Sequence, residues 1–273
     1  MNMRSFINTI SLVAVIVIVF SSCRTNRLAG TSPKKNTTEV IAHRGAFKKN
    51  KFPENSIASL REAIRLGCAG SEFDVRMTAD DSMVINHDPA YNKLEIEKST
   101  YKQLLAFTLS NGEKIPTLHE YLLAGKTNNP GTKLVVEIKP SGMGKERAQF
   151  ITDAVVGLVE KLDLRKNVVY ISFDYEMVKR VHVLDPKAHT QYLNGDKSPL
   201  ELKKDGITGL DYQYAVFEKN PDWIPMAHKE GIVLNAWTVN DAVNMDKLIN
   251  AGFAYITTNE PEMLFERVKL LKP

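Results

Sequence analysis

The chain has 273 residues, a length that suggests one large domain or two small ones. Hydrophobic residues make up 43% of it and charged residues 25%, the proportions of an ordinary soluble globular protein. The formal net charge is only +4 and there is no long basic run, so charge gives nucleic-acid binding no support.

Residues 1–22 have the layout of a secretory signal peptide. Arg4 lies in the leading segment, residues 6–20 are almost entirely apolar, and two serines precede Cys23. This apolar run is short for a membrane-spanning helix. The small residues before Cys23 resemble a bacterial lipobox, although Phe20 stands where leucine is more usual. The resemblance implies acylation of Cys23 and a lipoprotein anchored at a membrane of the bacterial cell envelope; an uncleaved signal anchor or ordinary secretion is the alternative.

The segment 23–38 is polar, contains glycine and proline and shows no periodicity, so we expect a flexible tether before a domain at 39–273. Cys68 is the one cysteine besides Cys23. The domain therefore cannot form an internal disulfide, and its hydrophobic core must stabilise it. Because Cys68 ends an apolar helical pattern, we predict a buried small hydrophobe rather than a catalytic thiol.

From Glu39 onward, short β-branched runs alternate with helical patterns. Eight strands are predicted, at residues 40–43, 71–76, 133–139, 167–173, 189–193, 207–211, 232–237 and 254–258. Apolar residues three and four apart, as in Ile57, Leu60 and Ile64, predict the intervening helices, and Thr117 begins a capping-box pattern.

Eight such units predict an α/β fold, a closed TIM (β/α)8 barrel. An open doubly wound sheet is the rival, but it would need a glycine-rich phosphate loop after its first strand, where the chain reads HRGAFKKN. The segment at about 88–116 breaks the alternation and is predicted to be a small insertion after the second strand.

Acidic side chains lie near the ends of two predicted neighbouring strands, where barrel enzymes form their active sites. Glu72 and Asp74 are two apart and so share one side of a strand, and Glu137 lies on the next. Three carboxylates cannot be buried together without a cation, so the set predicts one divalent ion, Ca²⁺ or Mg²⁺. The alternative is a structural ion cluster in which Glu72 and Glu137 pair with Arg44 and Lys139.

Two histidines and two cations are predicted at the same end of the barrel. His43 and Arg44 end the first strand, His87 follows the second, and Lys139 ends the third. One histidine can accept a proton while the other donates one, and Arg44 and Lys139 can bind an anion. With a metal, these groups suit the cleavage of a phosphate ester.

Short motifs between residues 40 and 261 resemble those of the glycerophosphodiester phosphodiesterase family. In order, they read HRG, PENS, EFDV, HDP, IPTLHEYL, VEIKP, SFD, AWTVN and ITTNEP. The resemblance implies a TIM barrel with a small insertion after its second strand. It also implies metal-dependent hydrolysis of glycerophosphodiesters to glycerol 3-phosphate and an alcohol.

The resemblance also assigns roles by position. It makes His43 and His87 the general acid–base pair, and Glu72, Asp74 and Glu137 the ligands of the divalent metal. Which histidine is the base in each step stays open at this point.

By the same resemblance, Arg44 and Lys139 hold the phosphate, Glu54 orients its neighbours and Trp237 lines the glycerol side. Two other functions stay open: a lysophospholipase D-like activity on lipids, and a non-catalytic lipoprotein that binds phosphodiesters. The sequence does not predict the oligomeric state.

Overall fold

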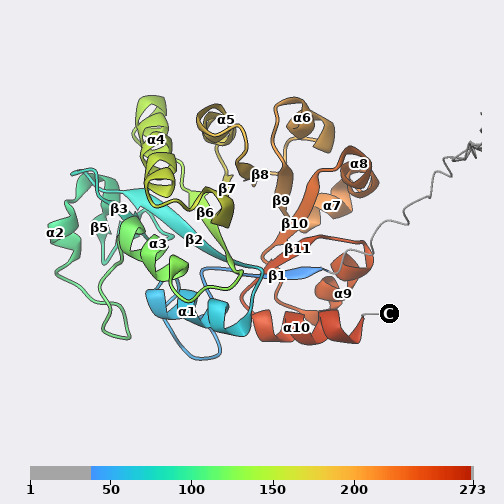
Figure 1. Cartoon of the computed structure of the whole chain (residues 1–273), viewed down its shortest axis with the longest axis horizontal. Helices are drawn as coiled ribbons and strands as arrows, with labels where there is room; N and C mark the ends of the chain where they lie inside the picture. Colours follow the sequence, from blue (N-terminus) through green and yellow to red (C-terminus); the bar gives the residue numbers. More distant parts are fainter. Residues whose placement is uncertain (1–37, 272–273) are drawn as a thin grey trace, which may run out of the picture. The chain divides into compact units, whose positions relative to one another are not determined.

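The computed structural model describes residues 38–271, in which eight parallel strands form a closed barrel (Figure 1). These strands are β1 (Glu39–Ala42), β2 (Gly70–Met77), β6 (Lys133–Ile138), β7 (Val168–Ser172), β8 (His189–Tyr192), β9 (Gly209–Gln213), β10 (Val233–Trp237) and β11 (Tyr255–Thr258). Each strand pairs with the next, and β1 closes the ring by pairing with both β2 and β11. The predicted barrel is confirmed, and the open sheet is wrong.

Six of the eight predicted strand ends differ from the observed ones, five of them by one residue. His43 and Lys139 lie one residue beyond β1 and β6, although their N–H groups still donate to Thr258 and Val75 of the neighbouring strands. Strand β9 begins and ends two residues later than predicted, so that Asp211 lies in its middle rather than at its end.

Helices surround the strands in Figure 1. They are α1 (Ile57–Leu66), α3 (Leu118–Lys126), α4 (Lys145–Lys161), α5 (Tyr175–Leu184), α6 (Pro199–Lys204), α7 (Ala215–Lys219), α8 (Trp223–Glu230), α9 (Ala242–Asn250) and α10 (Pro261–Leu270), with a short 3₁₀ helix at Arg165–Asn167. The predicted capping box at Thr117 is confirmed: its hydroxyl accepts from the N–H of Glu120, whose carboxylate accepts from the N–H of Thr117.

The chain leaves the barrel between β2 and α3. Strand β3 (Met83–Ile85) pairs antiparallel with β2, and the rest comprises the β4–β5 ribbon (Ala90–Tyr91, Leu94–Glu95), a 3₁₀ helix (Ile96–Lys98) and α2 (Tyr101–Leu104). Glu113 ties this segment to the barrel because its carboxylate accepts from the N–H groups of Ile57 and Ala58, in the first turn of α1.

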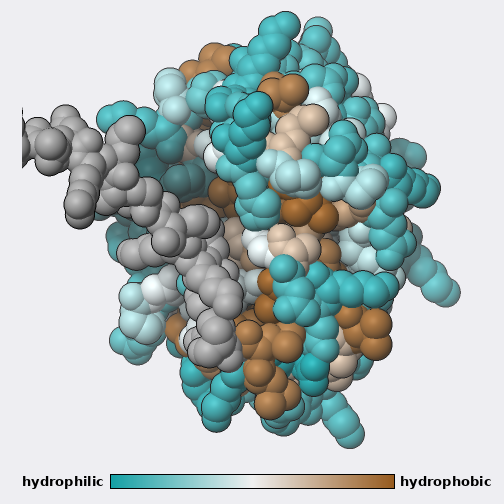
Figure 2. Space-filling model, turned by 90° about the vertical axis from the view of Figure 1, so that its right-hand side faces the viewer, coloured by the Kyte–Doolittle hydropathy of each residue, from teal (hydrophilic) through white to brown (hydrophobic). Residues whose placement is uncertain are grey.

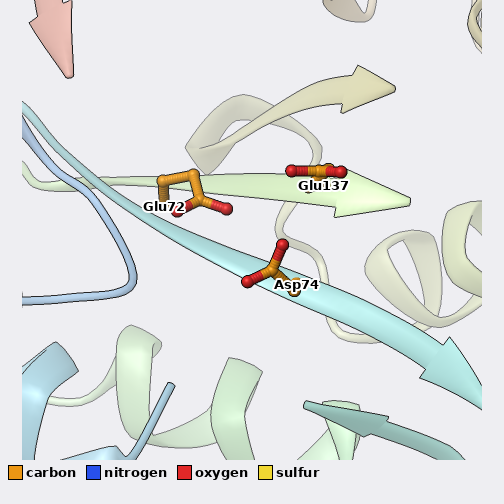
Figure 3. Close-up of side chains that lie close together, drawn as sticks. All are labelled: Glu72, Asp74 and Glu137. Carbon is orange, nitrogen blue, oxygen red and sulfur yellow. The ribbon is translucent and has the colours of Figure 1, made fainter. Parts of the chain in front are cut away.

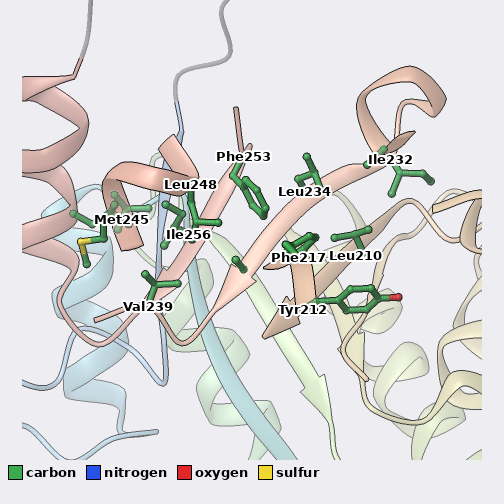
Figure 4. Close-up of a cluster of buried hydrophobic side chains, with 14 of the residues drawn as sticks. Leu210, Tyr212, Phe217, Ile232, Leu234, Val239, Met245, Leu248, Phe253 and Ile256 are labelled. Atoms are coloured by element: carbon green, nitrogen blue, oxygen red, sulfur yellow. The ribbon is translucent and has the colours of Figure 1, made fainter. Parts of the chain in front are cut away.

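The hydrophobic core lies between the strands and the helices. Figure 4 shows one part of it, where Leu234 of β10 and Ile256 of β11 lie among residues such as Phe253. Cys68 belongs to this cluster, and burial raises the pKa of its thiol to about 12. Its predicted role as a buried apolar residue is therefore confirmed.

The inside of the barrel is partly polar. Asn235 of β10 faces inward, donating to Gln191 of β8 at 3.3 Å and accepting from Thr257 of β11 at 3.2 Å. Apolar side chains such as Ile171 and Leu193 fill the space beside these groups. The barrel interior is thus filled by packed side chains, which can support polar groups at its carboxyl end.

No helix within residues 38–271 is long and apolar enough to span a bilayer. Figure 2 shows a face on which hydrophilic residues surround smaller hydrophobic patches. The predicted signal peptide and Cys23 lie outside the described residues, so the expectations for them stay predictions.

Candidate active site

A cavity of about 230 Å³ lies at the carboxyl ends of the barrel strands. Its lining includes seven of the predicted site residues, namely His43, Arg44, Glu72, His87, Glu137, Lys139 and Trp237. A larger cavity of about 460 Å³ lies near the start of β1, and among the described residues that line it Glu39 is the one with a carboxylate. Chemistry rather than size therefore selects the first cavity as the candidate active site.

Three buried carboxylates converge beside this cavity. Asp74 of β2 and Glu137 of β6 are direct partners in the strand register, and Glu72 lies two residues before Asp74 on the same face. One oxygen from each lies within 4.8 Å of the other two. In Figure 3 the three carboxylates lie close together above these two adjacent strands. The geometry follows from the two-residue repeat of a β-strand.

The carboxylates differ in the charge state that their surroundings favour. Burial and the charge of Asp74 raise the pKa of Glu72 well above its usual range, and the same causes raise that of Glu137 to about 7. Burial also disfavours the anion of Asp74, but Lys139 and a hydrogen bond from Asn55 outweigh it and lower the pKa. Without additional positive charge, the cluster therefore retains protons.

The oxygens of this cluster fit a hard divalent cation. Glu72 Oε1 is buried without a hydrogen-bond partner among the described residues. Lys139 supplies part of the charge, since its Nζ lies 2.7 Å from Glu137 Oε1 and 3.1 Å from Asp74 Oδ1. The alternative prediction, a structural ion cluster, therefore describes Glu137, which pairs with Lys139. It does not account for Glu72, because Glu72 Oε1 has no partner among the described residues. Oxygen ligands with surplus negative charge are those that Ca²⁺ and Mg²⁺ prefer.

The loop after β1 places Arg44 with unusual backbone geometry. Arg44 has φ 54° and directs its own N–H to Glu72 Oε2 at 2.8 Å. Gly45, with φ 80°, lies against α1, and a Cβ there would come within 2.4 Å of Ser59 Oγ. The glycine of HRG therefore permits the close packing that holds Arg44 over the carboxylates.

Two residues of the PENS motif hold the groups around Arg44. Glu54 Oε1 accepts from Arg44 Nη1 at 2.9 Å, and Arg44 Nε lies 3.7 Å from Asp74 Oδ2. Asn55 donates to Asp74 Oδ2 at 2.8 Å. Glu54 and Asp74 do not line the cavity themselves. Both contact Arg44, which does.

His43 is held with one nitrogen available. Its Nδ1 lies 2.7 Å from the side-chain oxygen of Asn259, which can only accept, so the proton is on Nδ1. Nε2 is then unprotonated and lies 3.9 Å from Glu72 Oε2. Burial and the charge of Arg44 lower the pKa of His43 to about 4. The ring is neutral at pH 7 and has a free lone pair.

His87 is more exposed and is differently supported. Its Nδ1 lies 2.8 Å from Asp88 Oδ1. Arg76 of β2 donates from Nε and Nη2 to the carbonyl oxygen of His87, at 2.9 and 2.7 Å. The two histidines thus lie at one cavity in contrasting surroundings.

Trp237, the last residue of β10, lines another part of the cavity. Its Nε1 donates to the carbonyl oxygen of Asp211 at 2.8 Å, and its ring meets Phe173 edge to face with centroids 5.4 Å apart. Asp211 also lines the cavity and is 1% exposed.

Sequence reasoning missed Asp211, Asn55, Arg76 and Asn259. Asp211 could have been found, because a carboxylate in an otherwise apolar predicted strand at 207–211 is the same signal that identified Glu72. Arg76 lies two residues after Asp74 and so shares its face of the strand, and the same reasoning could have identified it.

The sequence profile of the glycerophosphoryl diester phosphodiesterase family matches residues 43–263. The chain belongs to this family. The resemblance inferred from the sequence motifs is therefore confirmed, and the protein is an enzyme of the family.

Individual relatives agree with this assignment. The crystal structure of a glycerophosphodiester phosphodiesterase from Parabacteroides distasonis is similar, with 40% identity, a TM-score of 0.83, and coverage of 86% of this chain and 98% of that one. A glycerophosphodiester phosphodiesterase of Caldanaerobacter subterraneus subsp. tengcongensis is 28% identical over 85% of this chain and 98% of its own. A phosphodiesterase of Oleispira antarctica, solved with the product sn-glycerol-3-phosphate, has a similar fold, with a TM-score of 0.72, 24% identity and coverage of 85% and 97%.

Proposed function

We propose that this enzyme hydrolyses glycerophosphodiesters to sn-glycerol 3-phosphate and an alcohol, and that it requires one divalent cation. The observation that carries the proposal is the placement of three convergent carboxylates and two histidines around one cavity in a member of this family. The product in the Oleispira structure supports the substrate class, since that barrel has a similar fold.

Glu72, Asp74 and Glu137 would hold the cation, Ca²⁺ or Mg²⁺. Its charge would displace the protons retained by Glu72 and Glu137 and would stabilise negative charge on the phosphate oxygens. Asn55 and the N–H of Arg44 hold two of these ligands in place.

His43 is the base of the first step. Its free Nε2 takes the proton of the glycerol 2-hydroxyl as that oxygen attacks phosphorus. The bond from phosphorus to the alcohol oxygen breaks, and His87 donates a proton to the departing oxygen. The products of this step are the alcohol and a cyclic glycerol phosphate.

The second step reverses these roles. Water attacks phosphorus and gives its proton to His87, while the bond from phosphorus to the glycerol 2-oxygen breaks. His43 returns its proton to that oxygen, so that both histidines regain their starting states and glycerol 3-phosphate is released.

Arg44 and Lys139 are the proposed phosphate contacts. Glu54 fixes the Arg44 guanidinium by accepting from Nη1, so that the remaining N–H groups can serve an anion. Trp237, with its indole N–H engaged by Asp211, offers an apolar face to the carbons of glycerol.

The test is a panel of glycerophosphodiesters with different headgroups, assayed for glycerol 3-phosphate release with and without chelator. We expect turnover that chelation abolishes and that Ca²⁺ or Mg²⁺ restores. Glu72→Gln should remove it while the protein still folds. Full turnover in excess chelator, with no metal in the protein, would refute the metal requirement; no turnover with any diester would refute the function.

We also propose that the mature protein is held in the bacterial cell envelope through a lipid on Cys23. The order of a basic leader, an apolar run and small residues before Cys23 supports this. Cys23→Ala protein should lose the lipid and leave the membrane fraction. If it is still acylated and sediments with membranes, the proposal is wrong.

A further inference from the structure

Asp211 is a buried carboxyl group for which the proposed mechanism has no use. It is 1% exposed, and its Oδ1 has no hydrogen-bond partner among the described residues. Burial and the charge of Glu137 raise its pKa well above the usual range, and no cation among residues 38–271 offsets them. A buried carboxyl oxygen without a partner is destabilising, so its presence in this strand calls for a functional explanation.

Other carboxylates at the site have partners. Glu72 accepts from the N–H of Arg44, Asp74 from Asn55, and Glu137 lies against Lys139. The inward residue beside Asp211 in the strand register, Asn235, bonds to neighbours on two strands. Asp211 lines the cavity, and it alone among these groups has a side chain with no hydrogen bond or ion pair to any described residue.

The position of Asp211 indicates which part of a substrate it faces. Strand β9 lies four strands from β2 in either direction around the ring of eight, so Asp211 is across the barrel from Glu72 and Asp74. A diester whose phosphate lies at the carboxylate cluster would extend one substituent toward Asp211 and Trp237. The other substituent would lie toward His87, whose side chain is 35% exposed.

The headgroup differs from one glycerophosphodiester to another, so it suits the exposed side of the cavity near His87. The glycerol moiety is common to all of them, so it suits the enclosed side near Asp211. In the proposed mechanism the glycerol 2-hydroxyl is at His43, and the 3-oxygen is bonded to phosphorus. The hydroxyl left without an assigned partner is the terminal one at carbon 1, and the oxygen left without a partner is Oδ1 of Asp211.

We propose that Asp211 is a specificity-determining residue that hydrogen-bonds the terminal hydroxyl of the glycerol moiety. The inference rests on the proposed function and specifies its substrate class: diesters in which this hydroxyl is free. An acyl chain on the same oxygen would remove the hydrogen and crowd Asp211, so lysophospholipids acylated there should be poor substrates.

The test compares two diesters that share the attacking 2-hydroxyl. One is glycerophosphocholine, and the other is its 1-deoxy analogue, in which a methyl group replaces the terminal CH₂OH. The metal-loaded enzyme should prefer glycerophosphocholine by about 10–100-fold in kcat/KM, as a site does when a polar partner is lost. In Asp211→Ala the preference should fall below about threefold, chiefly through slower cleavage of glycerophosphocholine.

Controls separate recognition from structure. Asn235→Ala removes an adjacent buried polar group that has internal partners, so it should lower the thermal midpoint and slow both diesters alike. Asp211→Ala should leave that midpoint unchanged or raise it, since no internal bond is lost. Asp211→Val, which fills more of the same space, serves if the alanine variant does not fold, and Asp211→Asn should retain part of the preference.

The outcomes are distinguishable. If the wild-type enzyme cleaves neither diester, the proposed function is wrong, and this inference falls with it. If the wild-type enzyme cleaves both equally, or if Asp211→Ala slows both by the same factor and keeps the preference, the function stands and the role of Asp211 is refuted.

Discussion

The side-chain amide of Asn55 holds Asp74 at two points. Its Nδ2 donates to Asp74 Oδ2 at 2.8 Å, and its Oδ1 accepts from the N–H of Asp74 at 3.1 Å. Asn55 is 4% exposed and has φ 59°, a left-handed conformation that asparagine tolerates better than most residues. One loop residue thus fixes both the backbone and the carboxylate of a proposed metal ligand.

Replacing Asn55 with alanine should therefore weaken metal binding. Loss of a group that orients a ligand typically costs about 10–100-fold in metal affinity. The free energy of unfolding should also fall, by about 1–3 kcal/mol, because the amide bonds to Asp74 are lost. Calorimetric titration with Ca²⁺ or Mg²⁺ and a denaturant series would measure the two effects.

Asn128→Ala is the matched control. Asn128 has φ 52° but is exposed, so its replacement introduces similar backbone strain away from the site. It should leave metal affinity at the wild-type value. Wild-type affinity in Asn55→Ala as well would show that Asp74 does not need this support.

Metal binding should weaken in acid. Burial and Asp74 raise the pKa of Glu137 from 4.5 to about 7 in the metal-free protein, so below pH 7 a proton competes with the cation. Each such proton reduces the apparent affinity by up to about tenfold per pH unit below that pKa. Titrations at several pH values, in buffers with different heats of ionisation, would measure both the affinity and the protons released. Constant affinity from pH 5 to 8 would contradict this.

The same shift predicts how the stability of the metal-free protein depends on pH. A carboxyl with a raised pKa binds more protons when folded than when unfolded, here between pH 4.5 and about 7. Its contribution to the free energy of unfolding therefore declines as pH rises through this window. Glu137→Gln removes this titration, so the variant should lose less stability than wild type over the same interval.

The barrel was predictable because its strands show local signals. Runs such as KLVVEIK predict buried strands from β-branched residues alone, and β6 at Lys133–Ile138 agrees with the predicted 133–139 to one residue. The positions of the site side chains that lie on strands were predictable from the same strand patterns. Once β2 is a strand, Glu72 and Asp74 must share a face.

The contacts made by loops were not predictable in this way. The bond from Asn55 to Asp74 depends on a left-handed backbone at Asn55, and the bond from Asn259 to His43 joins residues 216 positions apart. Neither has a periodic signature, since the conformation of these loops depends on contacts between residues far apart in the sequence. The orphaned oxygen of Asp211 is likewise visible only when every neighbour is placed.

Arg76→Met should impair catalysis without impairing metal binding. Arg76 donates two hydrogen bonds to the carbonyl oxygen of His87, and losing them lets the histidine backbone move relative to β2. Misplacement of a catalytic group by about 1 Å can cost about 100-fold in rate. We expect kcat to fall about 10–100-fold, with little change in KM or in metal affinity.

Arg180→Met is the control, because Arg180 also makes a two-point contact, with Asp153 on the neighbouring helix, outside the cavity lining. It should leave kcat unchanged. An equal loss in both variants would mean that general destabilisation, and not the position of His87, explains the effect.

Alanine variants of the two histidines should lose activity for different reasons. His43→Ala removes the proposed base and His87→Ala the proposed acid, so each should lose about 10²–10⁴-fold in kcat on glycerophosphocholine. Substrate affinity should fall much less, because Arg44, Lys139 and the carboxylate cluster are unaltered.

A leaving group that needs no proton separates the two roles. With a nitrophenyl diester of glycerol, the departing phenolate is stable as an anion, so His87→Ala should recover most of its rate in the first step. His43→Ala should not recover, because the 2-hydroxyl still has to lose its proton. The measurement is single-turnover release of nitrophenolate by both variants and by wild type. Rescue of His43→Ala instead would reverse the assignment, and a loss of only a few fold in both variants would mean that neither histidine transfers a proton.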